Sequence, residues 1–255
     1  MNAPTRVLVL ENDPSDDARL FGDWLTAAGV AWDTLRAHAG EPVPADLSGY
    51  GGLVVLGGAQ DAYDAPDGTP GAPWFPALKA LLRVARRDGV PTLGICLGAQ
   101  LIAEAFGGVV EPGEAGFEIG PRLVGKRDAA HGDPLFGAVP FTPDVLQWHS
   151  DDITELPAGA VLLAGSPRHA NQAFRLGDRM WAVQFHFECD LAMIADWADE
   201  DPGRLTGLGL DRETLLARTA AVLPDVAEVW RPFTERFAAL VAGRVGGTLL
   251  PVIDG

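Results

Sequence analysis

Apolar and amphipathic stretches alternate through the first half of the chain. Four mostly apolar runs have the length of buried strands: Val7–Leu10, Val30–Leu35, Leu53–Leu56 and Val90–Ile95. Three stretches carry apolar residues at helical spacing and end at a glycine: Asp16–Ala28, Trp74–Asp88 and Leu97–Phe106. Strands that alternate with helices in this way predict an α/β fold, with a central, mostly parallel sheet and helices on both faces.

The second half of the chain follows a different pattern. Strand-like runs are separated by turn residues alone: Glu118–Val124, Val145–Trp148, Val161–Ala164, Gln172–Arg175 and Met180–His186. These runs predict mixed or antiparallel strands added to the same sheet. From Leu191 onward the pattern is helical, with Trp230 and Phe233 on one apolar face and a kink predicted at Pro232. We see no linker or repeat, and therefore predict a single domain over residues 1–255.

Composition and charge narrow the class of protein. Hydrophobic residues make up 47% and charged residues 21%, which is ordinary for a soluble globular protein. The net charge of −16 argues against a nucleic-acid or membrane-surface partner, because both favour a basic surface. No apolar run has the length of a signal peptide or a membrane span, so we expect a cytoplasmic protein. Two cysteines exclude a disulfide framework and a Cys-rich zinc site, although one disulfide stays possible.

A cysteine flanked by glycines stands where a predicted strand meets a predicted helix. In Gly94-Ile95-Cys96-Leu97-Gly98 the glycines lie two residues before and two after the cysteine. This spacing is that of a nucleophile elbow, whose sharp turn leaves no space for side chains at the flanking positions. Cys96 would project from the carboxyl end of the sheet, and the free N–H of Leu97 could form half of an oxyanion hole. Alternatively, Cys96 is a small buried apolar residue, as free cysteine usually is.

Among the histidines, His186 has the most informative surroundings. Alternation along Met180–Glu188 places His186 and Glu188 on the same face of a strand, opposite the large apolar residues. An imidazole oriented by a carboxylate is the partner that a cysteine nucleophile requires. The alternative is a surface His–Glu pair at a polar strand end. Gly57 and Gly58 directly follow an apolar strand, where they would bring the backbone close to a ligand or form an ordinary turn.

Taken in order, three blocks resemble the class I (triad) glutamine amidotransferase family: Leu56-Gly57-Gly58, the block from Gly94 to Gln100, and the block from Gln184 to Glu188. Its stand-alone, GMP-synthase-like members share elements similar to Glu118-Ile119-Gly120, Gln147-Trp148-His149 and Asn171-Gln172-Ala173-Phe174. The resemblance implies a flavodoxin-like fold, with a catalytic core over about 6–196 and a C-terminal helical extension over about 197–245.

The resemblance also implies a mechanism. Cys96 would attack the side-chain amide of glutamine, while His186, oriented by Glu188, moves the proton. The N–H groups of Gly58 and Leu97 would hold the oxyanion, and ammonia would pass to a separate synthetase or acceptor subunit. Neither a cofactor nor a metal is implied. The substrate-binding positions that it implies are Gln100, Gly57, Glu118, Ile119, Gly120, Asn171 and Gln172.

Two other functions stay open at this point. A hydrolase or transpeptidase of γ-glutamyl peptides or amines would form the same thioester, and a non-catalytic binding protein could use the same fold. Loops 60–73 and 112–116 would contact the leaving group. The acidic residues of the first loop could attract a cationic amine or could simply be solvated: Asp61, Asp64 and Asp67.

The chain departs from the family pattern at two positions. Phe187 and Ala59 stand where the family usually has proline, and Phe187 frees a backbone N–H that proline lacks. Cys189 has no role in the family pattern, so we expect it to be structural.

Overall fold

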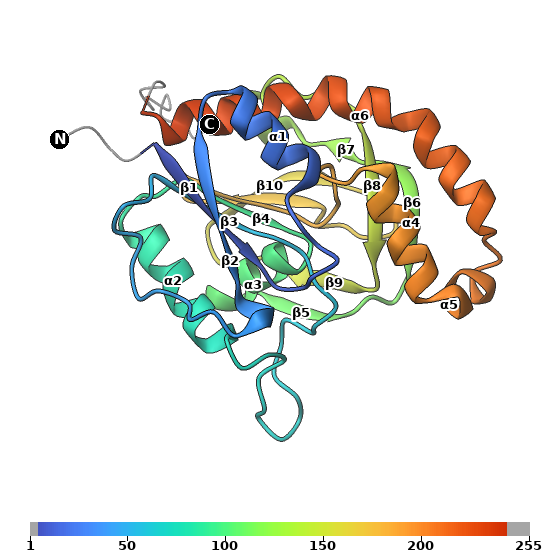
Figure 1. Cartoon of the computed structure of the whole chain (residues 1–255), viewed down its shortest axis with the longest axis horizontal. Coiled ribbons are helices and arrows are strands. Elements are labelled where there is room, and N and C mark those ends of the chain that lie inside the picture. The colour runs from blue at the N-terminus through green and yellow to red at the C-terminus, as the bar shows by residue number, and fades with distance from the viewer. Residues whose placement is uncertain (1–4, 244–255) are drawn as a thin grey trace.

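The computed structural model describes residues 5–243 and is built around an eight-stranded sheet, with strand order β2-β1-β3-β4-β12-β11-β10-β7 (Figure 1). The first five strands run parallel: β2 (Ala31–Arg36), β1 (Arg6–Glu11), β3 (Gly52–Val55), β4 (Thr92–Ile95) and β12 (Met180–Val183). The last three are antiparallel: β11 (Ala173–Leu176), β10 (Ala160–Gly165) and β7 (Gly125–Lys126). The predicted mostly parallel sheet with added antiparallel strands is confirmed.

Helices cover both faces of this sheet because its central strands are apolar on both sides (Figure 1). One face packs against α1 (Arg19–Ala27) and α6 (Arg212–Val241). The other packs against α2 (Phe75–Arg87) and α3 (Leu97–Ala105). Two short 3₁₀ helices, η1 (Ala37–Ala39) and η2 (Asp128–Gly132), lie in connections.

Two antiparallel pairs stand outside the main sheet. β5 (Val109–Pro112) pairs with β9 (Asp151–Glu155), and β6 (Glu118–Leu123) pairs with β8 (Asp144–His149). The prediction that the runs at 118–124 and 145–148 join the main sheet is therefore wrong. Their apolar side chains form a separate core with the C-terminal helices, which include α4 (Leu191–Glu200) and α5 (Pro202–Gly207).

The segment after β12 keeps the predicted alternation although the regular strand ends at Val183. His186 exchanges two backbone hydrogen bonds with Leu146 of β8, with N–O distances of 2.7 and 2.9 Å. Phe185 and Phe187 continue the apolar face of β12 into the core beneath α6. Gln184, His186 and Glu188 are therefore aimed at the opposite side.

The C-terminal part is helical, as predicted. α6 continues past Pro224 and Pro232, so the proline at 232 does not end the helix. The predicted limit of the extension, residue 245, lies outside the described residues. None of the helices in residues 5–243 is long and apolar enough to cross a membrane.

Candidate active site

Cys96 occupies a strained turn between β4 and α3. Its φ of +52° and ψ of −111° lie outside the regions that residues other than glycine favour. A Cβ on Gly94 would lie 2.5 Å from the carbonyl oxygen of Gly98, and a Cβ on Gly98 would lie 2.0 Å from that of Val55. The turn therefore requires glycine at both flanking positions, as the spacing predicted.

The first turn of α3 leaves backbone donors beside Cys96. The N–H groups of Ala99 and Gln100 donate to the Cys96 carbonyl, at 2.9 and 3.1 Å. Within the described residues the N–H of Leu97 has no backbone partner. Gly58 lies against the same turn, because a Cβ there would come within 2.9 Å of Leu97 Cδ2. The structure thus brings the two predicted oxyanion-hole residues together.

His186 and Glu188 form a buried pair, each 2% exposed. Nδ1 of His186 lies 2.6 Å from Oε1 of Glu188, and the backbone N–H of Phe187 donates to Oε2 at 2.9 Å. Proline at position 187 could not make that second hydrogen bond. The Phe187 ring also stacks on Trp230, with centroids 4.9 Å apart and planes inclined by 17°. The departure from proline therefore adds contacts that hold the carboxylate.

The electrostatics of this pair favour a charged imidazole. Burial opposes protonation of His186, but the carboxylate of Glu188 and the nearby Cys96 overcome it and raise the imidazole pKa well above its ordinary value. Cys189 is fully buried next to Glu188, and both effects raise the pKa of its thiol. Both cysteines are free. Cys189 is thus held in its neutral form.

Cys96 and His186 open into one cavity of about 380 Å³. Its walls come from the loops after β1 and β3, from the Cys96 turn, from the β8–β9 connection and from α4 and α5. Beside the lining residues Cys96 and Gln100, the side-chain amide of Gln184 donates toward Cys96 Sγ at 3.7 Å and accepts from Gln100 Nε2 at 3.2 Å. Trp197 of α4 packs edge-to-face on His186, with centroids 4.8 Å apart.

The cavity wall is strongly acidic. Its lining includes one guanidinium, that of Arg204, which pairs with Asp201 at 2.9 Å, and five carboxyl side chains: Asp16, Asp61, Asp151, Glu200 and Asp201. Burial raises the pKa of Asp16 to about 7; the nearby His186 opposes this rise, and neighbouring carboxylates such as Glu188 add to it. Burial and the nearby Asp61 raise the pKa of Asp151 in the same direction. Such a wall favours a ligand that carries positive charge.

Of the predicted substrate-binding residues, one lines the cavity and the others do not. Gln100 lines the cavity, whereas Gly57 lies behind its wall, where a Cβ would come within 3.2 Å of the His186 ring. Five others lie off the lining: Glu118, Ile119, Gly120, Asn171 and Gln172. Asn171 instead donates to the carbonyl of Ile153, and Gln172 accepts from Gln147. Their contact with substrate stays a prediction.

Sequence reasoning missed Asp16, Gln184 and Trp197. The helix predicted from Asp16 begins at Arg19, so Asp16 lies in the preceding loop and its carboxyl group reaches the cavity. Gln184 could have been predicted from the sequence, since alternation along the strand places it on the same face as His186. Trp197 carried none, because its position depends on the docking of α4.

The mostly parallel sheet, the strained cysteine at a strand–helix turn and the buried His–Glu pair after the adjacent strand define an α/β protein whose cysteine turn has the geometry of a nucleophile elbow. The chain belongs to the class-I glutamine amidotransferase family: the family model "Glutamine amidotransferase class-I" matches residues 25–193. This confirms the resemblance on which the sequence prediction rested.

Named relatives fall into two groups. Gamma-glutamyl peptidase 4 of Arabidopsis thaliana is 31% identical over 183 residues, which cover 71% of this chain and 70% of that protein. A GMP synthase [glutamine-hydrolyzing] of Porphyromonas gingivalis is 35% identical over 147 residues, 57% of this chain but only 26% of the synthase. Among solved structures, a glutamine amidotransferase of Thermotoga maritima has a TM-score of 0.81 at 27% identity, over 91% of this chain and 97% of that chain.

Proposed function

We propose that this protein hydrolyses the side-chain amide of glutamine through a cysteinyl γ-glutamyl thioester. One observation carries the proposal: the strained Cys96 and the His186–Glu188 pair open into the same cavity. Burial of the pair and its short contact argue against a surface ion pair, and the strain at Cys96 argues against an ordinary core cysteine.

In the proposed reaction, the sulfur of Cys96 attacks the carbon of the carboxamide. The N–H groups of Leu97 and Gly58 stabilise the oxyanion of the tetrahedral intermediate. Protonated His186 gives its proton to the departing nitrogen, the C–N bond breaks, and ammonia leaves. Neutral His186 then accepts a proton from water, whose oxygen attacks the thioester carbon. The C–S bond breaks, glutamate leaves, and the Cys96 sulfur and protonated His186 return to their starting state. Glu188 holds the imidazole in the required orientation throughout.

A second candidate substrate class is favoured by the acidic cavity wall. A γ-glutamyl compound whose leaving group is a cationic amine or a peptide would pass through the same thioester, and the carboxylates around the cavity would attract the amine. The relatives support this candidate, since the chain spans 70% and 82% of two γ-glutamyl peptidases but about a quarter of the GMP synthases. If glutamine is the substrate, the ammonia passes to a separate synthetase or acceptor subunit.

A substrate panel tests both candidates. Purified protein is assayed on glutamine, a γ-glutamyl dipeptide and a γ-glutamyl diamine, alongside Cys96→Ala and Cys189→Ala as matched cysteine variants. We expect Cys96→Ala to lower turnover by at least about 10³-fold. We expect a far smaller loss in Cys189→Ala, because its sulfur contacts Glu188 at 3.8 Å but does not line the cavity.

The panel separates the outcomes. Preference for the γ-glutamyl diamine supports the second candidate, whereas preference for glutamine supports the first. Wild-type turnover by Cys96→Ala overturns the mechanism. No cleavage of any panel member, together with no preferential alkylation of Cys96 by a glutamine-analogue electrophile, supports a non-catalytic binding protein.

A further inference from the structure

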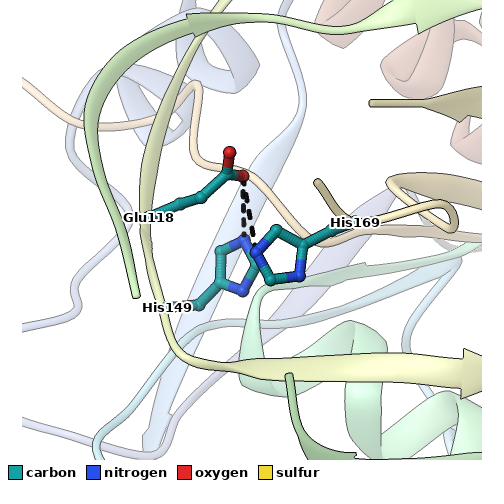
Figure 2. Close-up of side chains that lie close together, drawn as sticks. All are labelled: Glu118, His149 and His169. Carbon is teal, nitrogen blue, oxygen red and sulfur yellow. Dashed lines mark ion pairs between the residues drawn. The ribbon is translucent and has the colours of Figure 1, made fainter. Parts of the chain in front are cut away.

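A second cluster of buried titratable side chains lies beside the cavity: Glu118, His149 and His169 (Figure 2). Their exposed fractions are 3%, 4% and 0%. Oε2 of Glu118 lies 3.8 Å from Nε2 of His149 and 3.9 Å from Nε2 of His169. The two contacts converge on one carboxylate oxygen. Neither is short enough to be a hydrogen bond.

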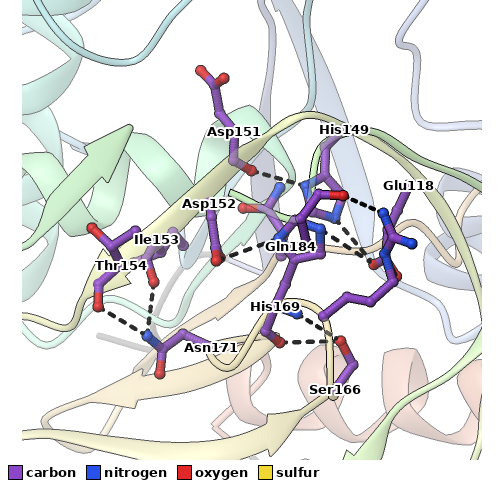
Figure 3. A network of polar contacts seen from close by, with 12 residues as sticks. Glu118, His149, Asp151, Asp152, Ile153, Thr154, Ser166, His169, Asn171 and Gln184 are labelled. Carbon is purple, nitrogen blue, oxygen red and sulfur yellow. Dashed lines mark hydrogen bonds and ion pairs between the residues drawn. The ribbon is translucent and has the colours of Figure 1, made fainter. Parts of the chain in front are cut away.

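Both imidazoles have their other nitrogen directed at an acceptor (Figure 3). Nδ1 of His149 lies 2.8 Å from the carbonyl oxygen of Asp151. Nδ1 of His169 lies 3.3 Å from Oδ2 of Asp152. An Nδ1–H in this arrangement leaves the lone pair of Nε2 pointing at Glu118, as in metal-binding histidines with a carbonyl or carboxylate behind them. Oε2 of Glu118, both Nε2 atoms and Nδ1 of His169 have no hydrogen-bond partner within residues 5–243.

The backbone brings these side chains together from three separate segments. Glu118 and His149 are directly opposite each other in the antiparallel pair of β6 and β8. His169 closes a turn after β10, where its own N–H donates to Ser166 Oγ and its carbonyl accepts from the Ser166 N–H, at 3.1 and 3.0 Å. The ring of His169 lies against that of His149, with centroids 4.8 Å apart. Backbone hydrogen bonds therefore hold each of the three segments in place.

We propose that Glu118, His149 and His169 form a binding site for a divalent transition-metal ion, with Zn²⁺ as the best match. The ligand atoms all lie within 4.8 Å of one another. Tetrahedral Zn²⁺ with bonds of about 2.0–2.2 Å holds its ligand atoms about 3.3–3.6 Å apart. The two separations between Glu118 and the imidazoles would therefore shorten by a few tenths of an ångström on binding, and the separation of the two imidazole nitrogens, which is at most 4.8 Å, by up to about 1.5 Å. Two imidazoles and one carboxylate are a known zinc donor set, with water as the fourth ligand.

A different arrangement of charges competes with this proposal. Arg168 Nε lies 3.5 Å from the other carboxylate oxygen of Glu118, and a protonated His169 would lie between Glu118 and Asp152. That arrangement leaves Nε2 of His149 facing an imidazole and a carboxylate without a hydrogen bond. A metal ion instead satisfies Oε2 of Glu118 and both Nε2 atoms at once, with Arg168 next to the oxygen of Glu118 that does not bind metal.

The site would lie next to the substrate cavity without being part of the cysteine chemistry. Of its three ligands, only His149 also lines the cavity. The ion would fix the β6–β8 pair to the turn after β10. The sequence pattern does not predict this site, because its ligands include no cysteine and come from three separate segments.

Metal binding is tested on the full chain in a Cys96→Ala/Cys189→Ala background, which removes both thiols near His186 and with them the other possible zinc ligand set, His186, Glu188 and Cys189. The protein is stripped with a chelating resin, titrated with ZnCl₂ and assayed for bound zinc after desalting. Glu118→Gln and His169→Gln are compared with His131→Gln, a matched substitution at an exposed histidine. Circular dichroism establishes that each variant is folded.

We expect one equivalent of zinc in the parent and in His131→Gln, and an affinity at least about 10-fold weaker in the two ligand variants. Zinc-edge X-ray absorption of the parent, which needs no variant, should show nitrogen and oxygen ligands including two imidazoles. A sulfur ligand at about 2.3 Å overturns the proposal. So does a parent that keeps no zinc, or equal zinc affinity in all three variants. These readouts do not depend on whether any γ-glutamyl compound is cleaved.

Discussion

Cys96 and His186 are positioned in different ways, one by backbone geometry and the other by a side-chain contact. Cys96 is held by backbone geometry, because the glycines on either side permit a conformation that its own side chain disfavours. His186 is held by a carboxylate, and that carboxylate is held in turn by the N–H of Phe187. The second arrangement can be tested by a change of one atom.

Glu188→Gln replaces one carboxylate oxygen by an NH₂ group. The amide would present either a donor to His186 Nδ1 or a donor to the Phe187 N–H, so one of the two short contacts is lost. We expect kcat for the best γ-glutamyl substrate to fall by about 10²-fold or more, with a smaller change in KM, because the imidazole loses its orientation and its charge partner. Glu155→Gln, the same change at an exposed position outside the cavity, should leave both constants unaltered. Equal kcat in the two variants would show that Glu188 does not orient the base.

Asp16 predicts a pH dependence of stability. Burial raises its pKa from 3.8 to about 7, so the folded protein binds a proton that the unfolded chain releases near pH 4. The folded state therefore loses stability as pH rises from about 4 to 7. Asp16→Asn removes this titration, and its free energy of unfolding relative to wild type should rise over the same range, by at most about 4 kcal/mol. Denaturant unfolding of both proteins at pH 5, 6, 7 and 8 measures this free-energy difference. A difference that does not change with pH would contradict the raised pKa of Asp16.

At the scale of elements, the sequence predicts those helices and strands whose positions depend on local periodicity. The parallel strands, the four helices that cover them and the cysteine turn follow from apolar spacing and from Gly94 and Gly98. Local periodicity does not predict which strands pair. The patterns along 118–124 and 145–148 indicate strands, but they do not indicate the strand with which each one pairs. Their separate sheet, and with it the cluster of Glu118, His149 and His169, follows from packing against helices distant in sequence.

The junction of β3, β4 and α3 leaves no space for a side chain at position 98. In Gly98→Ala the new methyl group would lie 2.0 Å from the carbonyl oxygen of Val55, and backbone cannot move away as a flexible side chain can. We expect a loss of about 3 kcal/mol or more in the free energy of unfolding, at the upper end of overpacking effects. Gly132→Ala is the matched control, since nothing lies within 4 Å of a Cβ there. Urea denaturation of both variants gives the comparison, and equal stabilities would refute the close approach.

At the scale of the whole molecule, the C-terminal helices belong to the site as well as to the core. The predicted catalytic core ended at about residue 196, yet Trp197, Glu200 and Arg204 line the cavity. α6 contributes Trp230, whose ring stacks on Phe187 next to the His–Glu pair. We therefore propose that the described chain folds as one domain, without a separable helical extension.

Cooperative unfolding distinguishes one domain from a core with an appended extension. Trp230 is fully buried, contacts Phe187 and donates from Nε1 to the carbonyl of Asp144 at 2.9 Å, so it joins α6 to both the sheet and the β6–β8 pair. Trp230→Ala should cost about 3–5 kcal/mol, and far-UV circular dichroism and tryptophan fluorescence should shift together along the denaturant axis. Leu208→Ala, at a residue that is 43% exposed, should move neither probe appreciably. A separable extension would instead give an early, partial transition in Trp230→Ala while the sheet signal kept its wild-type midpoint, because the remaining strands and helices would then be stable without α6.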